Sequence, residues 1–404
     1  MIGFYNGESY YQFQDIGEFL SCVLQPRYAG WRFFAHFGGR FDVHFIFDWL
    51  RKNRRDTDMR IYCSGSAVIS LTIRKLGTSI KWRFADSYRL IPGSLEKLTN
   101  EYAVEHKKLS KDFLSVVYNM HDCIGLYEVL TSFYDTFDIC SETIATHAMR
   151  LFRMKYLKKG LPATHLNVED FCRQSYWGGR CEVYRYDKAN LNHYDVNSLY
   201  PYAMLQSVPV AYEGVSCDID SCNNINQIGF FDVTVTAPEM HVPPLPYFNK
   251  RLIFPVGTFR AVFSSVELVA AIERGVKIEK VHYGRVFFAE PILREYAESL
   301  FKMKAEAERE GKTAVRYTCK ILLNSLYGKF AQRRTQDLYV IGDDAPIGSF
   351  PLPHSRDISI VKYFSRAVHV LPHISACITS RSRVIQVGYM ESVGNSLWYS
   401  DTDS

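Results

Sequence analysis

The adjacent glycines Gly178 and Gly179 interrupt a series of regular patterns and divide the chain into two parts of different character. On the amino-terminal side, alternating apolar and polar residues predict strands, and longer periodic stretches predict helices. Strands are expected within residues 31–49 and at 66–73 and 79–86, and helices at 112–135 and 141–158. We therefore expect residues 1–160 to be α/β and residues 172–181 to form a linker.

The part of the chain that follows the glycines is more varied. Proline, asparagine and short β-like runs mark residues 206–262 as a β-rich insertion. Strand signals occur at 181–186 and 191–197, helical patterns at 291–310, 312–330 and 373–392, and loop and strand signals at 335–372. The chain ends on Ser-Asp-Thr-Asp-Ser directly after an apolar run, so we interpret the sequence as a fragment or a truncated reading frame.

The composition is that of an ordinary globular protein. The 404 residues allow two or three domains, and the net charge of +5 is too small to identify a nucleic-acid partner. No apolar run is long enough to span a bilayer, and residues 1–20 lack the basic start of a signal peptide, which argues against secretion. The ten cysteines contain no Cys-x-x-Cys pair, so reduced thiols of an intracellular protein are expected.

Two segments place carboxylates after apolar residues. Asp195 lies in the segment YDVNSLYP, and Asp401 and Asp403 lie in the segment YSDTDS. Two carboxylates so close together repel each other, and a hard divalent cation is the usual compensation. Each segment also has an ordinary explanation, because a strand-end aspartate can cap a helix and an Asp/Ser run is commonly a solvated turn.

A third segment, within residues 312–330, has a polar helical face. Helical spacing places four side chains on that face: Arg316, Lys320, Asn324 and Tyr327. Cys319 and three leucines take the opposite face. A cation, an amide and an aromatic ring in line can bind phosphate, sugar and base, although an amphipathic helix with a solvated polar face is the commoner case.

Together, the three segments contain the parts of a phosphoryl-transfer site. Two-metal catalysis needs carboxylates that hold ions about 4 Å apart. It also needs a cation that neutralises the leaving pyrophosphate. Asp195, Asp403 and Lys320 supply that set.

The segments YDVNSLYP, KILLNSLYG and YSDTDS resemble, in order, motifs A, B and C of family B DNA polymerases. The resemblance implies a DNA-directed DNA polymerase that uses two Mg²⁺ ions, with Mn²⁺ as an alternative, and acts on a DNA primer-template and dNTPs. Asp195 and Asp403 would bind both ions together with the Val196 carbonyl, and Asp401 would be a supporting carboxylate. The implied nucleotide-binding residues are Ser198, Leu199, Tyr200 as steric gate under the sugar, Lys320 at the triphosphate, Asn324 and Tyr327.

Further motifs resemble other parts of the same family. YWGGR resembles the Y-x-G-G motif that joins the exonuclease and polymerase domains and contacts the template, while HFGGRFD and YNMHD resemble the second and third exonuclease motifs. Ser94-Leu95 resembles a motif that holds an unpaired primer end, although Ser-Leu pairs usually cap helices. The implied DNA-binding residues are Tyr176, Gly178, Gly179, Arg180, Ser94 and Leu95, and the implied exonuclease residues are Asp42, Tyr118 and Asp122.

Three family features are absent from the sequence. The D-x-E of the first exonuclease motif does not occur and would lie upstream of Met1. Phe37 stands where the family usually carries asparagine, and the thumb with its K-x-Y motif would follow residue 404. We therefore expect a 3′–5′ exonuclease domain that is incomplete at its amino terminus, and no thumb.

The spacing of the motifs indicates a branch of the family. The gaps between motifs A and B and between motifs B and C are long, and in the protein-primed branch such gaps hold two insertions, here at about 206–290 and 333–372. That branch occurs in linear phages, adenoviruses and linear mitochondrial plasmids, so the resemblance implies a terminal protein as primer and a viral or mitochondrial location. The alternatives are an RNA- or DNA-primed family B polymerase and a non-catalytic remnant that binds DNA.

The expected fold is α+β. Residues 1–172 would form an RNase H-like exonuclease domain, residues 173–181 the linker, and residues 182–404 the palm and fingers with the two insertions. No membrane partner is expected.

Overall fold

The structure is a computed structural model. It describes residues 2–53, 56–64, 67–109, 115–187, 190–224, 226–341, 348–351, 358–365 and 367–404. The chain forms two compact units. Unit 1 comprises Met1–Leu151, Met303–Leu322 and Arg333–Arg366, and unit 2 comprises Phe152–Lys302, Leu323–Gln332 and Ala367–Ser404.

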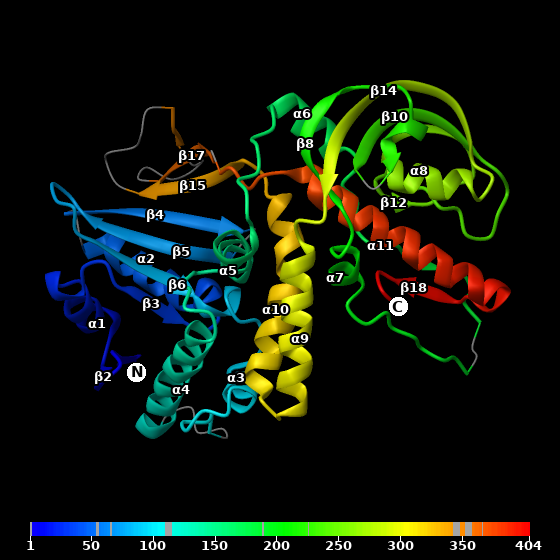
Figure 1. The fold of residues 1–404 in the computed structure, drawn as a ribbon. Helices are drawn as coiled ribbons and strands as arrows, with labels where there is room; N and C mark the ends of the chain where they lie inside the picture. Colours follow the sequence, from blue (N-terminus) through cyan, green and yellow to red (C-terminus); the bar gives the residue numbers. More distant parts are fainter. Residues whose placement is uncertain are drawn as a thin grey trace. The chain divides into compact units, whose positions relative to one another are not determined.

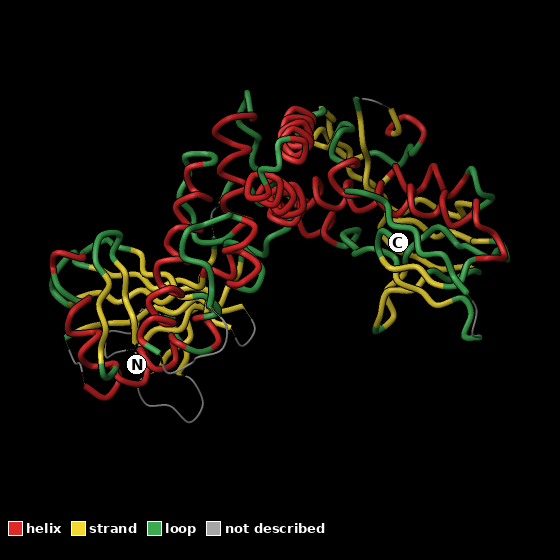
Figure 2. Tube along the Cα trace, turned by 90° about the horizontal axis from the view of Figure 1, so that it is seen from below, coloured by secondary structure: helices red, strands yellow, loops and turns green. Residues whose placement is uncertain are grey.

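Unit 1 is built on a seven-stranded mixed sheet in the order β16-β17-β15-β4-β5-β6-β3, in which only β3 and β6 are parallel among the pairs described (Figure 1). Its strands run side by side near the amino terminus in Figure 2. The strands are β1 Ile2–Tyr5, β2 Tyr10–Phe13, β3 Arg32–Ala35, β4 Thr57–Ser64, β5 Ala67–Lys75, β6 Lys81–Asp86, β15 Thr335–Ile341, β16 Phe350–Pro351 and β17 Ile358–Phe364. The helices are α1 Ile16–Val23, α2 Asp42–Asn53, α3 Leu95–Glu101, α4 Val116–Asp135 and α5 Ile144–Leu151.

Helices α1 and α2 pack on this sheet through their apolar faces, and α1 begins at a clear start signal. The Asp15 side chain accepts hydrogen bonds from the first free N–H groups of α1, a standard N-cap. Leu20 of α1, Leu50 of α2 and Leu71 of β5 are fully buried in one core. Gly77 has a φ of 69°, so it supplies the left-handed residue in the turn between β5 and β6.

Strands from the second predicted insertion extend the sheet of unit 1. β15 pairs antiparallel with β4 from Leu338 opposite Tyr62 to Ile341 opposite Met59, and β17 pairs with the other edge of β15. Strands β15 and β17 therefore belong to the same sheet as the amino-terminal strand β4, whereas residues 333–372 were assigned to the palm and fingers from the sequence. The predicted domain limits stay a prediction.

Unit 2 is built on a five-stranded antiparallel sheet in the order β13-β10-β14-β8, with β9 beside β10. The strands of the unit are β7 Cys181–Val183, β8 Val208–Val215, β9 Asn223–Asn224, β10 Gln227–Ala237, β11 Tyr247–Asn249, β12 Arg251–Ile253, β13 Gly257–Ser264, β14 Lys277–Glu290 and β18 Tyr399–Asp401. Its helices are α6 Leu166–Arg173, α7 Leu199–Ala203, α8 Ser265–Ile272 and α11 Pro372–Val393. Helices α9 Arg294–Arg309 and α10 Thr313–Phe330 contribute residues to both units.

The strand β10 shows why helices cover both faces of this sheet. Its side chains alternate, so that Phe231 and Val233 face a core shared with α8, while Phe230 faces a core shared with α6 and α11. In Figure 1, α11 runs beneath the sheet and beside β18. This helix thereby connects the sheet of unit 2 to the strand that carries Asp401.

The long helices agree with the sequence patterns. The patterns at 291–310, 312–330 and 373–392 correspond to α9, α10 and α11. The pattern at 112–135 corresponds to α4, with residues 112–114 outside the described part of the chain, and the pattern at 141–158 to α5 followed by a π-helical turn. The α+β fold class is confirmed. None of the ten cysteines, all of which lie in the described part of the chain, forms a disulfide. Among the described residues, no helix has the length and apolarity needed to cross a membrane.

The strand expected at 191–197 is wrong. Residues 190–196 form an extended loop with no strand partner, and Asp195 is exposed in it. Its side chains are mostly polar, and the one bond to another segment described for its backbone runs from Val196 N to Asp403 O at 2.6 Å. A single bond of this kind fixes Asp195 without forming a ladder.

Candidate active site

The segment YSDTDS forms a short strand and a tight turn at the site. β18 pairs antiparallel with β7, which places Asp401 opposite Cys181. Thr402 follows with a φ of 60°, and the N–H groups of Asp403 and Ser404 donate to the Asp401 carbonyl at 2.6 and 3.1 Å. The turn folds Asp403 back beside the strand.

Asp195 and Asp403 meet at this turn. Their segments are joined by the hydrogen bond between Val196 N and Asp403 O. Partial burial raises the pKa of Asp403, and the negative charge of Asp195 raises it further. Two nearby carboxylates that repel each other supply oxygen ligands of the kind that a hard divalent cation prefers.

Asp401 has a different environment from Asp403. Its carboxylate accepts hydrogen bonds from Cys181 Sγ at 3.0 Å and from Thr402 Oγ1 at 3.2 Å. These two bonds hold the pKa of Asp401 below its usual value. Asp401 is therefore fixed by its neighbours in this turn, whereas Asp403 lies near enough to Asp195 for the Asp195 charge to raise its pKa.

Unit 2 also contains a pair of stacked tyrosine rings. Tyr200 in α7 stacks on Tyr327 of α10, with ring centroids 4.7 Å apart and an angle of 5° between the planes. Burial raises the pKa of Tyr200 to about 12, so the ring is neutral at physiological pH. Ser198, which precedes α7, has a φ of 62°, and Leu199 is buried. Tyr327 is held in place because its carbonyl accepts from Ser375 Oγ of α11 at 2.6 Å.

The remaining nucleotide-binding candidates lie on α10. Asn324 is exposed in unit 2, and Lys320 is exposed in the part of α10 that belongs to unit 1. The opposite face of the helix is buried, as predicted: Cys319, Leu322, Leu323 and Leu326. The contact of Lys320 with a triphosphate stays a prediction.

The segment YWGGR packs against the carboxylate turn. Thr402 N donates to the Arg180 carbonyl at 2.8 Å, and Gly179 lies against Thr402. The Arg180 side chain is fully buried, where it pairs with Glu182 and donates to the Pro243 carbonyl at 2.6 Å. Its guanidinium therefore supports the fold. The roles of Tyr176, Gly178 and Gly179 toward DNA stay predictions.

Helix α11 contacts the segment YWGGR through an arginine that belongs to a buried ion pair. Arg383 and Glu267 are each 1% exposed, with Nε and Oε1 2.7 Å apart. Arg383 Nη1 also donates to the carbonyls of Trp177 and Gly178 at 2.7 and 2.9 Å. Sequence patterns did not identify either residue, because the pair joins α8 to α11 across more than a hundred positions.

The exonuclease candidates gather in unit 1. Asp42 begins α2 and Asp122 lies in α4, and burial and then the charges of both carboxylates raise the pKa of Cys123 to about 12. Lys108 Nζ donates to Asp122 Oδ2 at 2.9 Å and lies 4.9 Å from the ring centroid of Tyr118. Burial opposes the charge of Lys108, but its hydrogen bonds with Tyr118 and Asp122 prevail and raise its pKa.

Other residues of this group were not predicted from the sequence. Asp86 is 3% exposed and its charge contributes to the raised pKa of Asp42, after the larger effect of burial. The signal that would have found Asp86 is its position at the end of the strand at 79–86, next to Ser87.

The predicted pair Ser94-Leu95 lies at the start of a helix. Ser94 Oγ accepts from Lys97 N at 3.2 Å and so caps α3, with Leu95 buried behind it. The contact of this pair with a primer end stays a prediction.

Similarity to known proteins decides the family. A sequence profile described as "DNA polymerase type B, organellar and viral" matches residues 110–352, more than half of the chain. The chain belongs to this family of type B DNA polymerases. The predicted family resemblance is thereby confirmed, and polymerases of this family use divalent metal ions in catalysis.

Several named type B relatives match most of this polymerase chain. It is 26% identical to "Probable DNA polymerase" of Neurospora intermedia, over 98% of this chain and 49% of that protein. It is 25% identical to "DNA-directed DNA polymerase" of Enterobacteria phage PRD1, over 100% of this chain and 72% of that protein. The chain spans half or less of the length of the first curated relatives.

The type B polymerase fold is also found in solved structures. Phi29 DNA polymerase in an orthorhombic crystal form matches with a TM-score of 0.75 and 18% identity, over 98% of this chain and 74% of that chain. Phi29 DNA polymerase complexed with primer-template DNA and incoming nucleotide substrates matches with a TM-score of 0.74. The likeness shows a shared fold.

The close approach of Gly179 to the carboxylate turn leads to a prediction. A Cβ on Gly179 would lie 2.6 Å from Thr402 Cγ2 and 2.9 Å from Thr402 Cα, whereas a Cβ on Gly178 would have no neighbour within 4 Å. We expect Gly179→Ala to lower the free energy of unfolding by about 1–3 kcal/mol through overpacking. Gly178→Ala, the matched control, should change it by less than about 0.5 kcal/mol. Urea unfolding measures both, and equal effects of the two variants would refute the close packing.

The buried ion pair of the polymerase gives a second prediction. Glu267→Gln removes the charge partner of a fully buried arginine, so we expect the free energy of unfolding to fall by about 3–5 kcal/mol. The control is Asp232→Asn, because Asp232 pairs at 2.6 Å with Arg260, whose side chain is 57% exposed. That variant should cost less than about 1 kcal/mol. Urea unfolding measures both variants. If Glu267→Gln is as stable as Asp232→Asn, the buried ion pair does not contribute the predicted stability.

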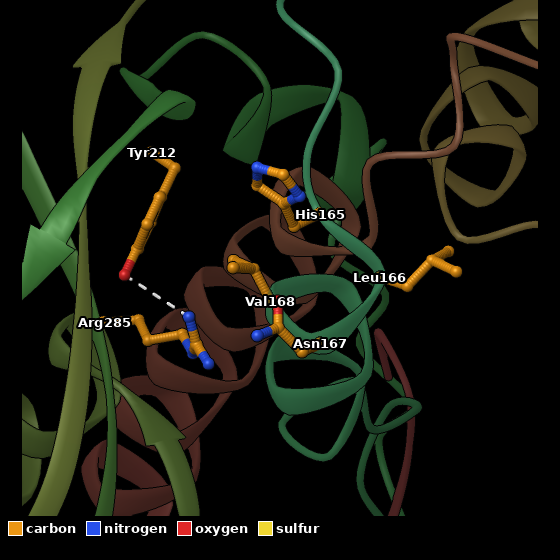
Figure 3. A pocket seen from close by; sticks show the side chains of 6 residues that line it. All are labelled: His165, Leu166, Asn167, Val168, Tyr212 and Arg285. Carbon is orange, nitrogen blue, oxygen red and sulfur yellow. Dashed lines mark hydrogen bonds between the residues drawn. The ribbon is translucent and has the colours of Figure 1, made fainter.

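Two further features of the polymerase chain carry no assigned chemistry. A cavity of about 570 Å³ is lined by His165, Leu166, Asn167, Val168, Tyr212 and Arg285 (Figure 3). Arg285 there packs on aromatic rings and donates to Tyr212 Oη at 3.3 Å, so its guanidinium already has a structural role.

In the described part of the chain, Glu105, His106 and Glu128 lie close enough to share a cation, but His106 already donates to Glu128 through its backbone.

Proposed function

We propose that this chain is the part of a DNA-directed DNA polymerase that carries out template-directed nucleotidyl transfer. The observation that carries the proposal is the meeting of Asp195 and Asp403 at one turn, held by the bond from Val196 N to Asp403 O. Because the chain spans only part of its relatives, the activity, substrates and partners of the whole protein are included in this proposal.

The proposed cofactor is a pair of Mg²⁺ ions, with Mn²⁺ as an alternative. Asp195, Asp403 and the Val196 carbonyl would hold them, and bound ions would activate the attacking hydroxyl and neutralise the leaving pyrophosphate. The contribution of the protein is to keep the two carboxylates facing each other. Asp401, fixed by Cys181 and Thr402, supports the shape of the turn.

The proposed nucleotide pocket uses the aromatic pair. Tyr200 would lie under the sugar of the incoming dNTP and exclude a 2′-hydroxyl, and its stacking on Tyr327 keeps the ring in one position. Asn324, in the same unit as the aromatic pair, would line the pocket, and the family resemblance implies a triphosphate contact for Lys320. Ser198 and Leu199 place Tyr200 at the start of α7.

The proposed priming mechanism is protein priming. A relative is the polymerase of phage PRD1, and another is the "DNA polymerase" of human adenovirus C serotype 2, 26% identical over 64% of this chain and 24% of that protein. The sheet of β8, β10, β13 and β14 occupies the interval 206–290, where the resemblance places a terminal-protein contact. A viral or organellar origin, including a linear mitochondrial plasmid, fits these relatives. The proposed residues of a 3′–5′ exonuclease site are Asp42, Tyr118 and Asp122.

Primer extension tests the proposal. The chain is incubated with a labelled DNA primer-template, dNTPs and Mg²⁺ or Mn²⁺, and extension products are resolved on a gel. Template-dependent extension supports the proposal, whereas binding of the primer-template without any extension supports a DNA-binding remnant. Covalent labelling of a terminal protein by a radioactive dNTP would support protein priming, and efficient extension of an RNA primer would favour the other branch.

A further inference from the structure

The amide of Gln386 in α11 is bonded to both strands of the pair that carries the carboxylate turn. Gln386 Nε2 donates to Ser400 Oγ of β18 at 2.6 Å and, more weakly, to the Arg180 carbonyl beside β7 at 3.4 Å. The same Arg180 carbonyl accepts from Thr402 N at 2.8 Å. Gln386 is 4% exposed and Ser400 is 1% exposed, so these contacts are shielded from water.

The strand geometry explains why Ser400 is the contact point. Side chains alternate along a strand, so Ser400 faces away from its neighbours Tyr399 and Asp401. The burial follows this alternation, because Ser400 is buried while Tyr399 and Asp401 are exposed. α11 thus contacts β18 through the buried Ser400, on the face opposite to the exposed Tyr399 and Asp401.

The strand pair is too short to fix its own position. β7 and β18 form three residue pairs, and an isolated two-stranded ribbon is marginally stable even when it is longer. A buried hydrogen bond from a long helix to the middle of β18 restricts both sliding and tilting of the turn that follows. The carboxylates of Asp401 and Asp403 inherit that restriction because they flank Thr402.

Stability alone does not account for an amide at this position. Gln386 Oε1 is buried and accepts no hydrogen bond from any residue that the structure describes. A buried acceptor without a partner costs free energy, and an apolar side chain of similar length would avoid that cost. The gain from the amide is therefore the defined geometry of Ser400 and of the Arg180 carbonyl.

We propose that Gln386 is a positioning residue for the carboxylate turn: through Ser400 and the Arg180 carbonyl it keeps the turn, and with it Asp403, aligned beside Asp195 to hold the catalytic ions. This inference rests on the proposed polymerase function. Gln386 touches no substrate, so its effect reaches the reaction only through the turn.

The test is the variant Gln386→Met, which keeps the length of the side chain and removes both donors. We expect kcat for primer extension to fall about tenfold and the Mg²⁺ concentration for half-maximal rate to rise several-fold, as for other residues that orient metal ligands. The KM for dNTP should stay within about twofold, because the aromatic pair is untouched. A merely structural role would lower the active fraction without shifting the Mg²⁺ dependence.

The matched control is Ser382→Ala. Ser382 is also buried in α11, but its Oγ donates to the Ile378 carbonyl of its own helix. This variant should leave kcat and the Mg²⁺ dependence within about twofold of the wild-type values. Equal Mg²⁺ shifts in both variants would show that any buried change in α11 has the same effect, which would overturn the proposal.

A second variant keeps the test decisive if Gln386→Met folds poorly. Ser400→Ala removes the acceptor on β18 and should produce the same rise in the Mg²⁺ requirement, and the double variant should be no worse than either single one. Unchanged Mg²⁺ dependence in Ser400→Ala, or additive losses in the double variant, would overturn the proposal. If the wild-type chain extends no primer, the proposed function fails instead, so the two failures are distinguishable.

Discussion

Asp195→Ala will abolish nucleotide incorporation while leaving the binding of primer-template DNA largely intact. The segment of Asp195 is bonded to Asp403 at the turn and the Asp195 charge acts on Asp403, so the variant removes one of the two carboxylates that would hold the ions. Because the developing charge of phosphoryl transfer is stabilised mainly by those ions, we expect kcat to fall at least about a thousandfold. Single-turnover primer extension measures the rate, and fluorescence anisotropy measures the DNA affinity.

Asp187→Ala is the control for this variant. Asp187 is exposed, lies in the segment that leads to Asp195, and pairs with Arg185 at 3.1 Å on the surface. Its removal changes the net charge by the same amount without touching the turn, so incorporation should stay within about twofold of the wild-type rate. Near-normal extension by Asp195→Ala would refute the assignment of the active site.

Tyr200→Val will allow ribonucleotides to be incorporated. The large ring of Tyr200 is fixed by stacking on Tyr327, so it cannot move aside for a 2′-hydroxyl. Valine leaves room beneath the sugar. We expect the preference for dNTP over rNTP, as the ratio of kcat/KM values, to fall about a hundredfold, an effect typical of a steric pocket. Steady-state kinetics with dCTP and CTP on one template measures the ratio.

Tyr202→Val is the control for the sugar preference. Tyr202 lies on the same short helix as Tyr200, but its side chain is 53% exposed. Its replacement should leave the sugar preference within about twofold. If Tyr200→Val and Tyr202→Val discriminate against CTP as strongly as the wild-type chain does, Tyr200 is not the gate.

Local patterns predicted the elements whose formation depends on their own residues. The four apolar residues of α10 from Cys319 to Leu326 recur at helical spacing, and the structure buries all of them. The polar face of the same helix carries Lys320 and Asn324, both exposed. Such a helix can be read from sequence because its buried stripe is set by the period of the helix itself.

Contacts between distant segments were not predicted, for a physical reason. The pairing of β15 with β4 joins residue 338 to residue 62, and no local period records which strand is the neighbour. The same holds for Lys108 beside Asp122, for Cys181 beside Asp401 and for Gln386 beside Ser400. Each is an ordinary residue in the sequence, and only the fold brings it to a carboxylate or its strand.

The strand wrongly expected at 191–197 is an element that was predicted from a local pattern and is not present in the structure. Its apolar residues Leu191, Tyr194 and Val196 alternate only in part, and the segment NLNHYDVN at 190–197 contains three asparagines, which disfavour strands and favour turns. The structure replaces a ladder with one backbone bond at Val196. The structure holds Asp195 near Asp403 by a loop in place of a strand.

The position of the catalytic ions tests the central claim most directly. Crystals of the chain with primer-template DNA, a non-hydrolysable dNTP and Mn²⁺ give anomalous difference maps that locate the metal without reference to activity. We predict metal peaks bridged by the carboxylates of Asp195 and Asp403, and loss of those peaks in Asp195→Ala. Metal bound to the DNA and nucleotide phosphates with both carboxylates turned away would contradict the account.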